Sequence, residues 1–393
     1  MTGTVPHDDV PATGLREVTA SRGGTVALAG LTLLAGPGEL VAVLGPSGSG
    51  KTTALRVLAG LEEADRGEVL VGGRPVTGLP PGRRGAAMVF ESTALVPFLD
   101  VARNLGWSLE RRVPREEAKA RVDDRSRRLR IRRLLPRRPD TLSEGERALV
   151  GIGRALVHTP EVFLLDEPLA HLDAAGRVEV RKEIVSVVRD LGVTTFWVTH
   201  DQAEALSVAD RVALLDGGSL AQVGTPAEVY ARPASLLVAG FVGAPAIGLL
   251  PARLVVSGGH AGFETGGRTL PLWGPVPAGL AAYAGREVVL GFRAEDVADG
   301  SGAVDPAAVV LPGVATTVEF TGRRTEVAAA IGAPPVTAPG ARFALGAGSG
   351  ATLRVFFPPR SPLRRGDGVR LAVDARRAHV FDPDTGRALH HPG

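Results

Sequence analysis

The stretch Leu40–Thr53, LVAVLGPSGSGKTT, decides the fold of this chain. It begins with an apolar run rich in Val and Leu after the turn Gly36-Pro37-Gly38, which is typical of a buried strand in a parallel sheet. The pattern G-x-x-x-x-G-K-T follows, and Ala54–Ala59 then reads as a helix. This order of strand, glycine-rich loop and helix is the one that a phosphate-binding loop requires.

The loop carries the residue types that hold nucleotide phosphates. Its glycines let consecutive backbone N–H groups point at phosphate oxygens in front of a helix N-terminus. We predict that Lys51 contacts the β and γ phosphates and that the Thr52 hydroxyl binds Mg²⁺. A chance match is the alternative in a chain with 51 glycines, and the flanking strand and helix argue against it. The predicted phosphate contacts are Gly45, Pro46, Ser47, Gly48, Ser49, Gly50, Lys51, Thr52 and Thr53.

Length and composition limit the architecture. A chain of 393 residues is too long for one hydrophobic core, so two or three domains are expected. It has no Cys, which excludes disulfides and thiolate metal sites. Residues 1–14 have no apolar core, so we predict a disordered N-terminus rather than a signal peptide. Glycines and prolines interrupt the uncharged stretch between Arg232 and Arg253, which we interpret as a helix end and linker rather than a membrane span.

Charge is concentrated in one segment. The net charge is only +3, but residues 110–140 contain twelve Arg and Lys119 against six acidic residues. A solvated helical face is one interpretation. Contact with an anionic membrane surface or with nucleic acid is the functional alternative.

Short apolar strands alternate with helices after the loop, which indicates an α/β fold with a parallel sheet. Between them, residues 101–139 are charged and helical in period, as expected of an all-helical insertion. Helices are predicted over 142–157 and 178–191, and strands over 86–90, 162–167, 194–199 and 211–215.

The character of the sequence changes beyond Gly240, where glycine, proline and short alternating runs dominate. These runs predict a separate all-β domain, and their short, even spacing favours a small barrel over a sandwich. They lie at 268–272, 287–292, 314–320, 352–357 and 369–373.

Three polar residues lie at the ends of predicted strands of the α/β region. Phosphoryl transfer to water needs a metal, a charge cradle and a group that orients or deprotonates the water. We predict that Asp166 holds Mg²⁺, that Glu167 is the general base and that His200 bonds the γ-phosphate. Each signal is weak alone, because acidic pairs are common and a lone His is usually structural. Together, beside a phosphate-binding loop, they form a strong set.

In their order these motifs resemble the ATPase subunits of ABC transporters, over almost the whole chain. Gly45–Thr52 is similar to the Walker A motif and Val162–Glu167 to Walker B with its catalytic Glu. Ala170–Asp173 is similar to the D-loop, and His200 to the switch histidine. Residues 142–146, Leu-Ser-Glu-Gly-Glu, occupy the place of the family signature Leu-Ser-Gly-Gly-Gln.

The resemblance implies a P-loop ATPase domain over 15–242, with a helical subdomain at about 93–145, and an OB-like regulatory domain over 243–393. It also implies a head-to-tail dimer, as a homodimer or with a paired ATPase subunit. Ser143 and Gly145 would then contact the γ-phosphate of the ATP that the partner subunit binds, and Asp173 of the D-loop is counted among the nucleotide-binding residues.

Finer matches resemble the maltose-type importer ATPases. That subgroup serves sugars, glycerol phosphates, polyamines and some metal or anion substrates. The resemblance implies a cytoplasmic, ATP-hydrolysing subunit on the inner face of the membrane. It would work beneath two permease subunits, with an external solute-binding protein as an indirect partner and no nucleic acid. The matching segments are Pro81–Phe90, Val198–Ala205, Gln222–Tyr230, Ala239–Gly243 and, in the β tail, Leu290–Asp296.

Three departures from the family pattern concern the site. Arg22 stands where an adenine-stacking aromatic residue is expected, and a guanidinium plane can also stack on a base. Glu91 replaces the Q-loop Gln, and we predict that it ligates Mg²⁺. Glu144 and Glu146 replace Gly and Gln of the signature. Ser143 and Glu146 also form a capping-box pattern, which by itself explains both residues.

Two other classes of function stay open. The acidic substitutions suggest an ATP-dependent regulatory switch with little turnover, which ATPase assays with and without permeases would separate from an importer subunit. The arginine-rich insertion and the OB-like tail suggest a soluble nucleic-acid-linked ATPase. Against the latter, the tail lacks the interleaved aromatic residues that stack on bases.

Overall fold

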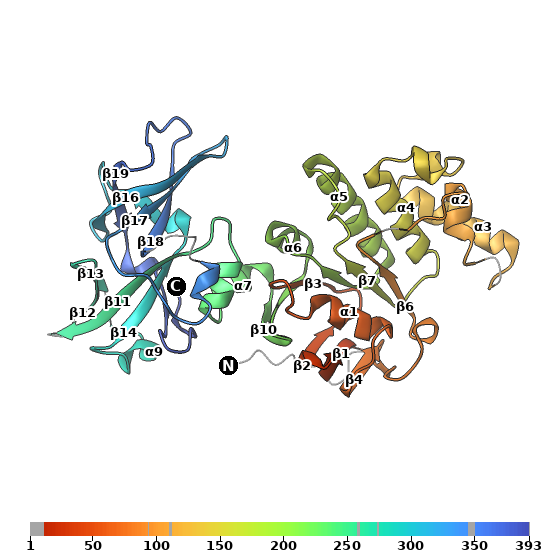
Figure 1. Cartoon of the computed structure of the whole chain (residues 1–393), viewed down its shortest axis with the longest axis horizontal. Helices are drawn as coiled ribbons and strands as arrows, with labels where there is room; N and C mark the ends of the chain where they lie inside the picture. The colour runs from red at the N-terminus through yellow and green to blue at the C-terminus, as the bar shows by residue number, and fades with distance from the viewer. Residues whose placement is uncertain are drawn as a thin grey trace. The chain divides into compact units, whose positions relative to one another are not determined.

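The computed structural model describes residues 12–92, 94–109, 112–257, 260–272, 275–344 and 350–392. The chain divides between Pro226 and Ala227 into two compact units (Figure 1). The first is an α/β unit and the second is built mainly from strands, as the sequence predicts.

The α/β unit contains a six-stranded sheet that carries the phosphate-binding loop. Its central strands run parallel, and an antiparallel strand closes one edge. In spatial order the strands are β10 (Ser219–Gly224), β9 (Arg211–Asp216), β3 (Leu40–Leu44), β8 (Thr194–Val198), β7 (Val162–Asp166) and β6 (Ala86–Val89). Because β3, β8 and β7 are neighbours and parallel, the residues that follow them meet at one edge of the sheet.

A second, antiparallel sheet of four strands lies in the same unit. Its apolar residues share one core with α1 (Lys51–Ala59) and with Val41 and Val43 of β3, so α1 packs between the two sheets. Leu40 of β3 belongs instead to the core with α4 (Glu144–Leu156) and α5 (Ala174–Leu191). This division follows from the alternation of side chains along a strand. The four strands, in spatial order, are β2 (Thr25–Ala35), β1 (Thr13–Arg22), β4 (Arg66–Val71) and β5 (Arg74–Pro75).

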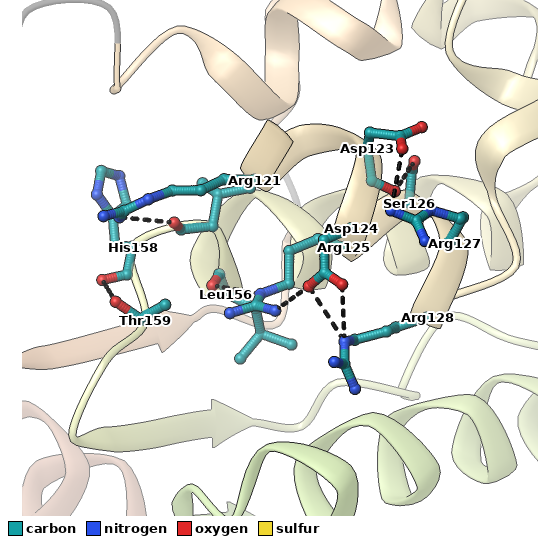
Figure 2. A network of polar contacts seen from close by, with 11 residues as sticks. Arg121, Asp123, Asp124, Arg125, Ser126, Arg127, Arg128, Leu156, His158 and Thr159 are labelled. Atoms are coloured by element: carbon teal, nitrogen blue, oxygen red, sulfur yellow. Dashed lines mark hydrogen bonds and ion pairs between the residues drawn. The ribbon is translucent and has the colours of Figure 1, made fainter. Parts of the chain in front are cut away.

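The arginine-rich segment is helical, as predicted. Figure 2 shows its polar network on α3 (Arg115–Arg128), where Asp124 lies between Arg125 and Arg128 and Asp123 contacts Arg127. Among the described residues of this segment, eight arginines are ion-paired, which favours a self-neutralised, solvated face. The pairs are Arg121–Glu117, Arg125–Asp124, Arg127–Asp123, Arg128–Asp124, Arg130–Glu183, Arg132–Asp123, Arg133–Glu146 and Arg137–Glu146. The helices are α2 (Val101–Gly106), α3 (Arg115–Arg128) and the 3-10 turns Arg132–Leu134 and Pro139–Thr141.

The second unit is an antiparallel sheet of eleven strands around its own core, which includes the fully buried Phe263 and Phe292. In spatial order the main path is β15 (Val297–Asp299), β19 (Gly368–Val373), β16 (Val309–Phe320), β17 (Thr325–Ala330), β18 (Thr352–Phe357), β11 (Gly248–Ser257), β14 (Glu287–Phe292), β20 (His379–Phe381) and β21 (Ala388–His390), with β12 (His260–Thr265) and β13 (Arg268–Leu272) branching from β11. The helices of the region are α7 (Pro226–Ala231), α8 (Leu236–Phe241) and α9 (Ala278–Ala281).

The structure divides the chain earlier than the predicted boundary after residue 242. The physical reason is α8, whose Leu236 and Ala239 are buried in one core with Leu249 and Phe381 of the β unit. The uncharged stretch between Arg232 and Arg253 thus contains α8, a linker and the start of β11. Within the described residues, no helix is both long and apolar enough to cross a membrane.

The N-terminal prediction needs a correction. Residues 1–11 lie outside the described part of the chain, but Thr13 and Gly14 belong to β1 rather than to a disordered tail. Thr13 pairs with Ala35 and is buried, and its hydroxyl accepts a hydrogen bond from the N–H of Gly72. These contacts are long-range, and the local sequence does not display them.

Candidate nucleotide site

The phosphate-binding loop runs from the end of β3 into α1 through backbone conformations that favour glycine. Gly45 has φ of 148°, and a Cβ there would lie 2.2 Å from the carbonyl oxygen of Leu215. Gly50 has φ of 98° and begins α1 with no side-chain cap. The first backbone N–H groups of α1 are therefore left for a ligand, and a helix N-terminus favours an anion.

Lys51 and Thr52 occupy the first turn of α1. The buried Lys51 ammonium donates hydrogen bonds of 2.9 Å to the carbonyl oxygens of Gly45 and Pro46, so it lies over the loop, and its contact with phosphate stays a prediction. Thr52 Oγ1 donates to Asp166 Oδ1 across 3.1 Å, which links α1 to the end of β7. A hydroxyl and a carboxylate are the hard oxygen donors that Mg²⁺ prefers, so the two residues fit that ion.

Burial shifts the proton equilibria of this group. Desolvation lowers the pKa of Lys51, while the charges of Glu167 and Asp166 oppose that change. Desolvation raises the pKa of Asp166, and the nearby charges of Glu167 and Glu91 act in the same direction, against the hydrogen bond from Thr52. The site thus holds a surplus of negative charge close to its one lysine, which suits a cation at the carboxylates.

Glu167 and His200 meet at the sheet edge. Glu167 follows β7 with φ of 49°, a left-handed conformation that is uncommon for a residue other than glycine. Its Oε2 lies 2.8 Å from Nδ1 of His200, which follows β8. Because a carboxylate can only accept, Nδ1 carries the proton in this contact. The roles of Glu167 as general base and of His200 as a γ-phosphate contact stay predictions.

The signature and the D-loop lie together. Ser143, Gly145 and Asp173 line one hollow of about 690 Å³ between the starts of α4 and α5. The predicted capping box is confirmed, since Ser143 and Glu146 exchange reciprocal hydrogen bonds of 3.1 and 3.2 Å. Asp173 caps α5 by accepting from the N–H of Gly176.

The acidic substitutions differ in their surroundings. Glu146 lies 3.2 Å from Arg133 and 3.5 Å from Arg137, so its charge is compensated within the subunit. Glu144 is exposed. Glu91 is also exposed, and its Oε1 lies 3.7 Å from Nε2 of His171 in the D-loop. Its assignment as a metal ligand stays a prediction.

Arg22, predicted to stack on the base, lies at the end of β1 with an exposed side chain. Its Nε is 3.9 Å from Glu62 Oε1, which also accepts a hydrogen bond of 3.1 Å from Arg56. Arg22 remains accessible, and its stacking role stays a prediction.

Sequence reasoning missed the role of one polar residue near His200. Glu204 on α6 (Gln202–Val208) is buried and accepts hydrogen bonds from Trp197 and Thr199. In the sequence, Glu204 is an acidic residue near the start of a short helix. Acidic residues are common there because they interact favourably with the helix dipole, so the sequence gives no sign that this one is buried.

These features define a class: a parallel sheet with a phosphate-binding loop, and an acidic strand end beside it, make this chain a P-loop nucleotide hydrolase. The comparisons then give the family. Residues 28–170 match the family model described as ABC transporter. The chain belongs to the ABC transporter family as an ATP-binding subunit that hydrolyses ATP.

Relatives match nearly end to end. The sulfoquinovosyl glycerol transport ATP-binding protein SmoE of Agrobacterium fabrum is 41% identical over 377 residues, covering 96% of this chain and 99% of the relative. The trehalose/maltose import ATP-binding protein MalK of Thermococcus litoralis is 40% identical over 377 residues, covering 93% and 96%. The sn-glycerol-3-phosphate import ATP-binding protein UgpC of Cereibacter sphaeroides is 38% identical over 377 residues, covering 95% and 99%.

A solved structure agrees with the fold of the first unit. The structure of cbiO1 from Clostridium perfringens, part of the ABC transporter complex cbiONQ, has a TM-score of 0.53 and 29% sequence identity. It covers 57% of this chain and 92% of the solved one.

Proposed function

We propose that this chain couples ATP hydrolysis to the uptake of a small, hydroxyl-rich solute, such as a sugar or a glycerol derivative. The observation that carries this proposal is the end-to-end match to relatives named for sulfoquinovosyl glycerol, trehalose/maltose and sn-glycerol-3-phosphate. The match spans both units, and it therefore includes the β unit as well as the ATPase unit.

ATP with Mg²⁺ is the proposed nucleotide. Thr52 and Asp166 would hold the metal, with Glu91 as the third candidate, and Lys51 would hold the β and γ phosphates. Glu167 would orient and deprotonate the attacking water while His200 holds Glu167 and the γ-phosphate. A metal supplies charge stabilisation in such chemistry, and the protein positions the reacting groups.

The proposed working form is a head-to-tail dimer. The support is that Ser143 and Gly145 of the signature line one hollow together with Asp173 of the D-loop. In the dimer this surface would cover the γ-phosphate held by the partner subunit's Lys51. Compensation of Glu146 by two arginines removes one source of repulsion toward that phosphate, which favours turnover over a low-activity switch.

Two membrane permeases are the proposed partners, with the chain on the inner face of the membrane. Three aromatic side chains near the helical segment support a docking surface there, because they expose apolar area that a partner would cover. Their exposed fractions are 43% for Phe90, 71% for Phe98 and 58% for Trp107.

Reconstitution tests the proposal. The full chain would be combined in vesicles with its candidate permeases, and ATP hydrolysis would be measured with candidate solutes and their binding protein. We expect hydrolysis to rise only when the matching solute and binding protein are present. A rate of ATP hydrolysis that is the same with and without permeases, or that rises with added DNA or RNA, would contradict an importer role.

A further inference from the structure

Glu204 is a buried carboxylate next to the candidate site but outside it. Its side chain lies on the first turn of α6, and its exposed fraction is 6%. Oε1 accepts a hydrogen bond of 2.5 Å from Nε1 of Trp197, and Oε2 accepts one of 3.0 Å from the hydroxyl of Thr199. Both donors are neutral, and the positive charge of Arg181 affects the pKa of Glu204 less than burial does. Keeping this carboxylate buried is therefore costly. Such a group calls for an explanation beyond packing.

The hydrogen bonds of Glu204 reach both neighbours of His200. Thr199 precedes His200, and its Oγ1 accepts a hydrogen bond of 3.0 Å from the N–H of Asp201, which follows it. Asp201 Oδ1 in turn accepts from the N–H groups of Ala203 and Glu204. The turn that carries His200 is therefore closed by side chains on both sides. Its start is also tied to the strand of the phosphate-binding loop, because the N–H of Thr199 donates to Val43.

His200 itself has little side-chain packing. Its side chain is 65% exposed, and the contact shown for its ring is the one with Glu167. The direction of the imidazole therefore depends on its backbone and on the contact with Glu167. Glu204 lines the same small hollow as Glu167 and His200.

We propose that Glu204 is a positioning residue, which fixes the turn Thr199–Asp201 and thereby holds His200 against Glu167. It acts through Thr199 and touches neither nucleotide nor metal. The inference rests on the proposed roles of His200 and Glu167. Burial raises the pKa of Glu204, and the hydrogen bonds from Thr199 and Trp197 oppose that rise.

Glu204→Gln in the full chain tests the proposal. Trp197 Nε1 can only donate, so the amide oxygen must face it and the NH₂ group then faces Thr199. The hydroxyl of Thr199 then loses the carboxylate that accepts its proton and can only accept from the NH₂ group, so a weaker neutral contact replaces the original one while the shape of the side chain is kept. We expect turnover at saturating ATP and Mg²⁺ to fall about tenfold, with nucleotide affinity changed less than about twofold. Thr199→Val removes the hydroxyl, and with it the whole link to Glu204, so its effect should be at least as large.

Ser207→Ala is the matched control on the same helix, because Ser207 Oγ bonds only the carbonyl of Glu204 among the contacts shown for it. Turnover of this variant should stay within about twofold of the original chain. If Glu204→Gln merely weakened α6, Ser207→Ala should lower turnover as well. An equal loss of turnover in the two variants would therefore overturn the proposal.

A double-mutant cycle with His200→Ala separates positioning from a structural effect. If Glu204 acts through His200, Glu204→Gln should lower turnover no further in the His200→Ala background. If the double variant instead loses turnover by the product of the two single-variant factors, the residues act independently and the inference is overturned. His200→Ala with unchanged turnover would instead refute the proposed role of His200.

NMR decides the positioning claim without activity. In chains labelled at histidine rings, His200→Ala identifies the signal of His200. Glu204→Gln and Thr199→Val should shift that signal, and Ser207→Ala should leave it in place. An unmoved signal in the first two variants would overturn the inference even if turnover fell.

Discussion

His200 Nδ1 and Glu167 Oε2 lie 2.8 Å apart, although 33 residues separate them in the chain. The contact exists because β7 and β8 are parallel neighbours, so that the residues after Asp166 and Val198 meet at the same edge. This edge also carries the end of β3, where the phosphate-binding loop begins.

Glu167→Gln should retain ATP binding and lower turnover by about 100-fold or more, the scale expected for removal of a general base. The Gln side chain keeps the size of Glu and can still bond His200, so loss of the base is the main change. Turnover would be measured by phosphate release and affinity by calorimetry. Lys51→Ala is the contrasting variant, because it should abolish tight nucleotide binding; unchanged turnover in Glu167→Gln would refute the assignment.

Glu91→Gln should raise the Mg²⁺ concentration needed for half-maximal activity, if Glu91 is a metal ligand. A neutral ligand attracts the cation less, while ATP affinity at saturating Mg²⁺ should hardly change. If Glu91 instead repels the γ-phosphate, Glu91→Gln should tighten ATP binding at every Mg²⁺ concentration. Magnesium titrations of activity and of ATP binding separate the two accounts.

His171→Gln is the control for that titration, because His171 faces Glu91 at 3.7 Å. The substitution removes the imidazole of residue 171 and keeps the Glu91 carboxylate. If His171→Gln reproduces the effect of Glu91→Gln, Glu91 acts through the D-loop rather than through the metal. Identical Mg²⁺ curves for all three proteins would place Glu91 outside the site.

A chain that ends at Pro226 should fold and bind ATP, since the first unit has its own cores. A chain that ends at Phe241 should also bind ATP but be less soluble. It would retain α8 without the partners that bury Leu236 and Ala239. Calorimetry and light scattering would compare the two, and equal solubility would argue against the role of α8 in the second core.

Glu146→Ala should destabilise the first unit by about 1 kcal/mol, because it removes half of the capping box. Glu146→Gln keeps a capping side chain and loses only the ion pairs with Arg133 and Arg137. These arginines are largely exposed, so the second variant should lose about 0.5 kcal/mol or less. Urea unfolding followed by the helical circular dichroism signal measures both, and equal losses would mean that the cap contributes nothing.

The sequence by itself determined which polar residues lie at the strand ends. Gly45–Thr52, Asp166, Glu167 and His200 each follow an apolar run that predicts a strand, and parallel strands share one carboxyl edge. It also predicted the β unit and the capping box of Ser143, because both depend on residues close together in the chain.

Only the tertiary structure decided which distant side chains meet. Glu146 looks like an extra charge in the signature, yet Arg133 and Arg137 reach it from the preceding segment. Leu236 belongs to a helix that local pattern attaches to the ATPase unit, but its apolar face is buried in the core of the β unit. The sequence places Glu204 at the start of a helix, and only the fold shows that Trp197 and Thr199 donate hydrogen bonds to it. Periodicity reports which face of an element is apolar, and it carries no information about which other element covers that face.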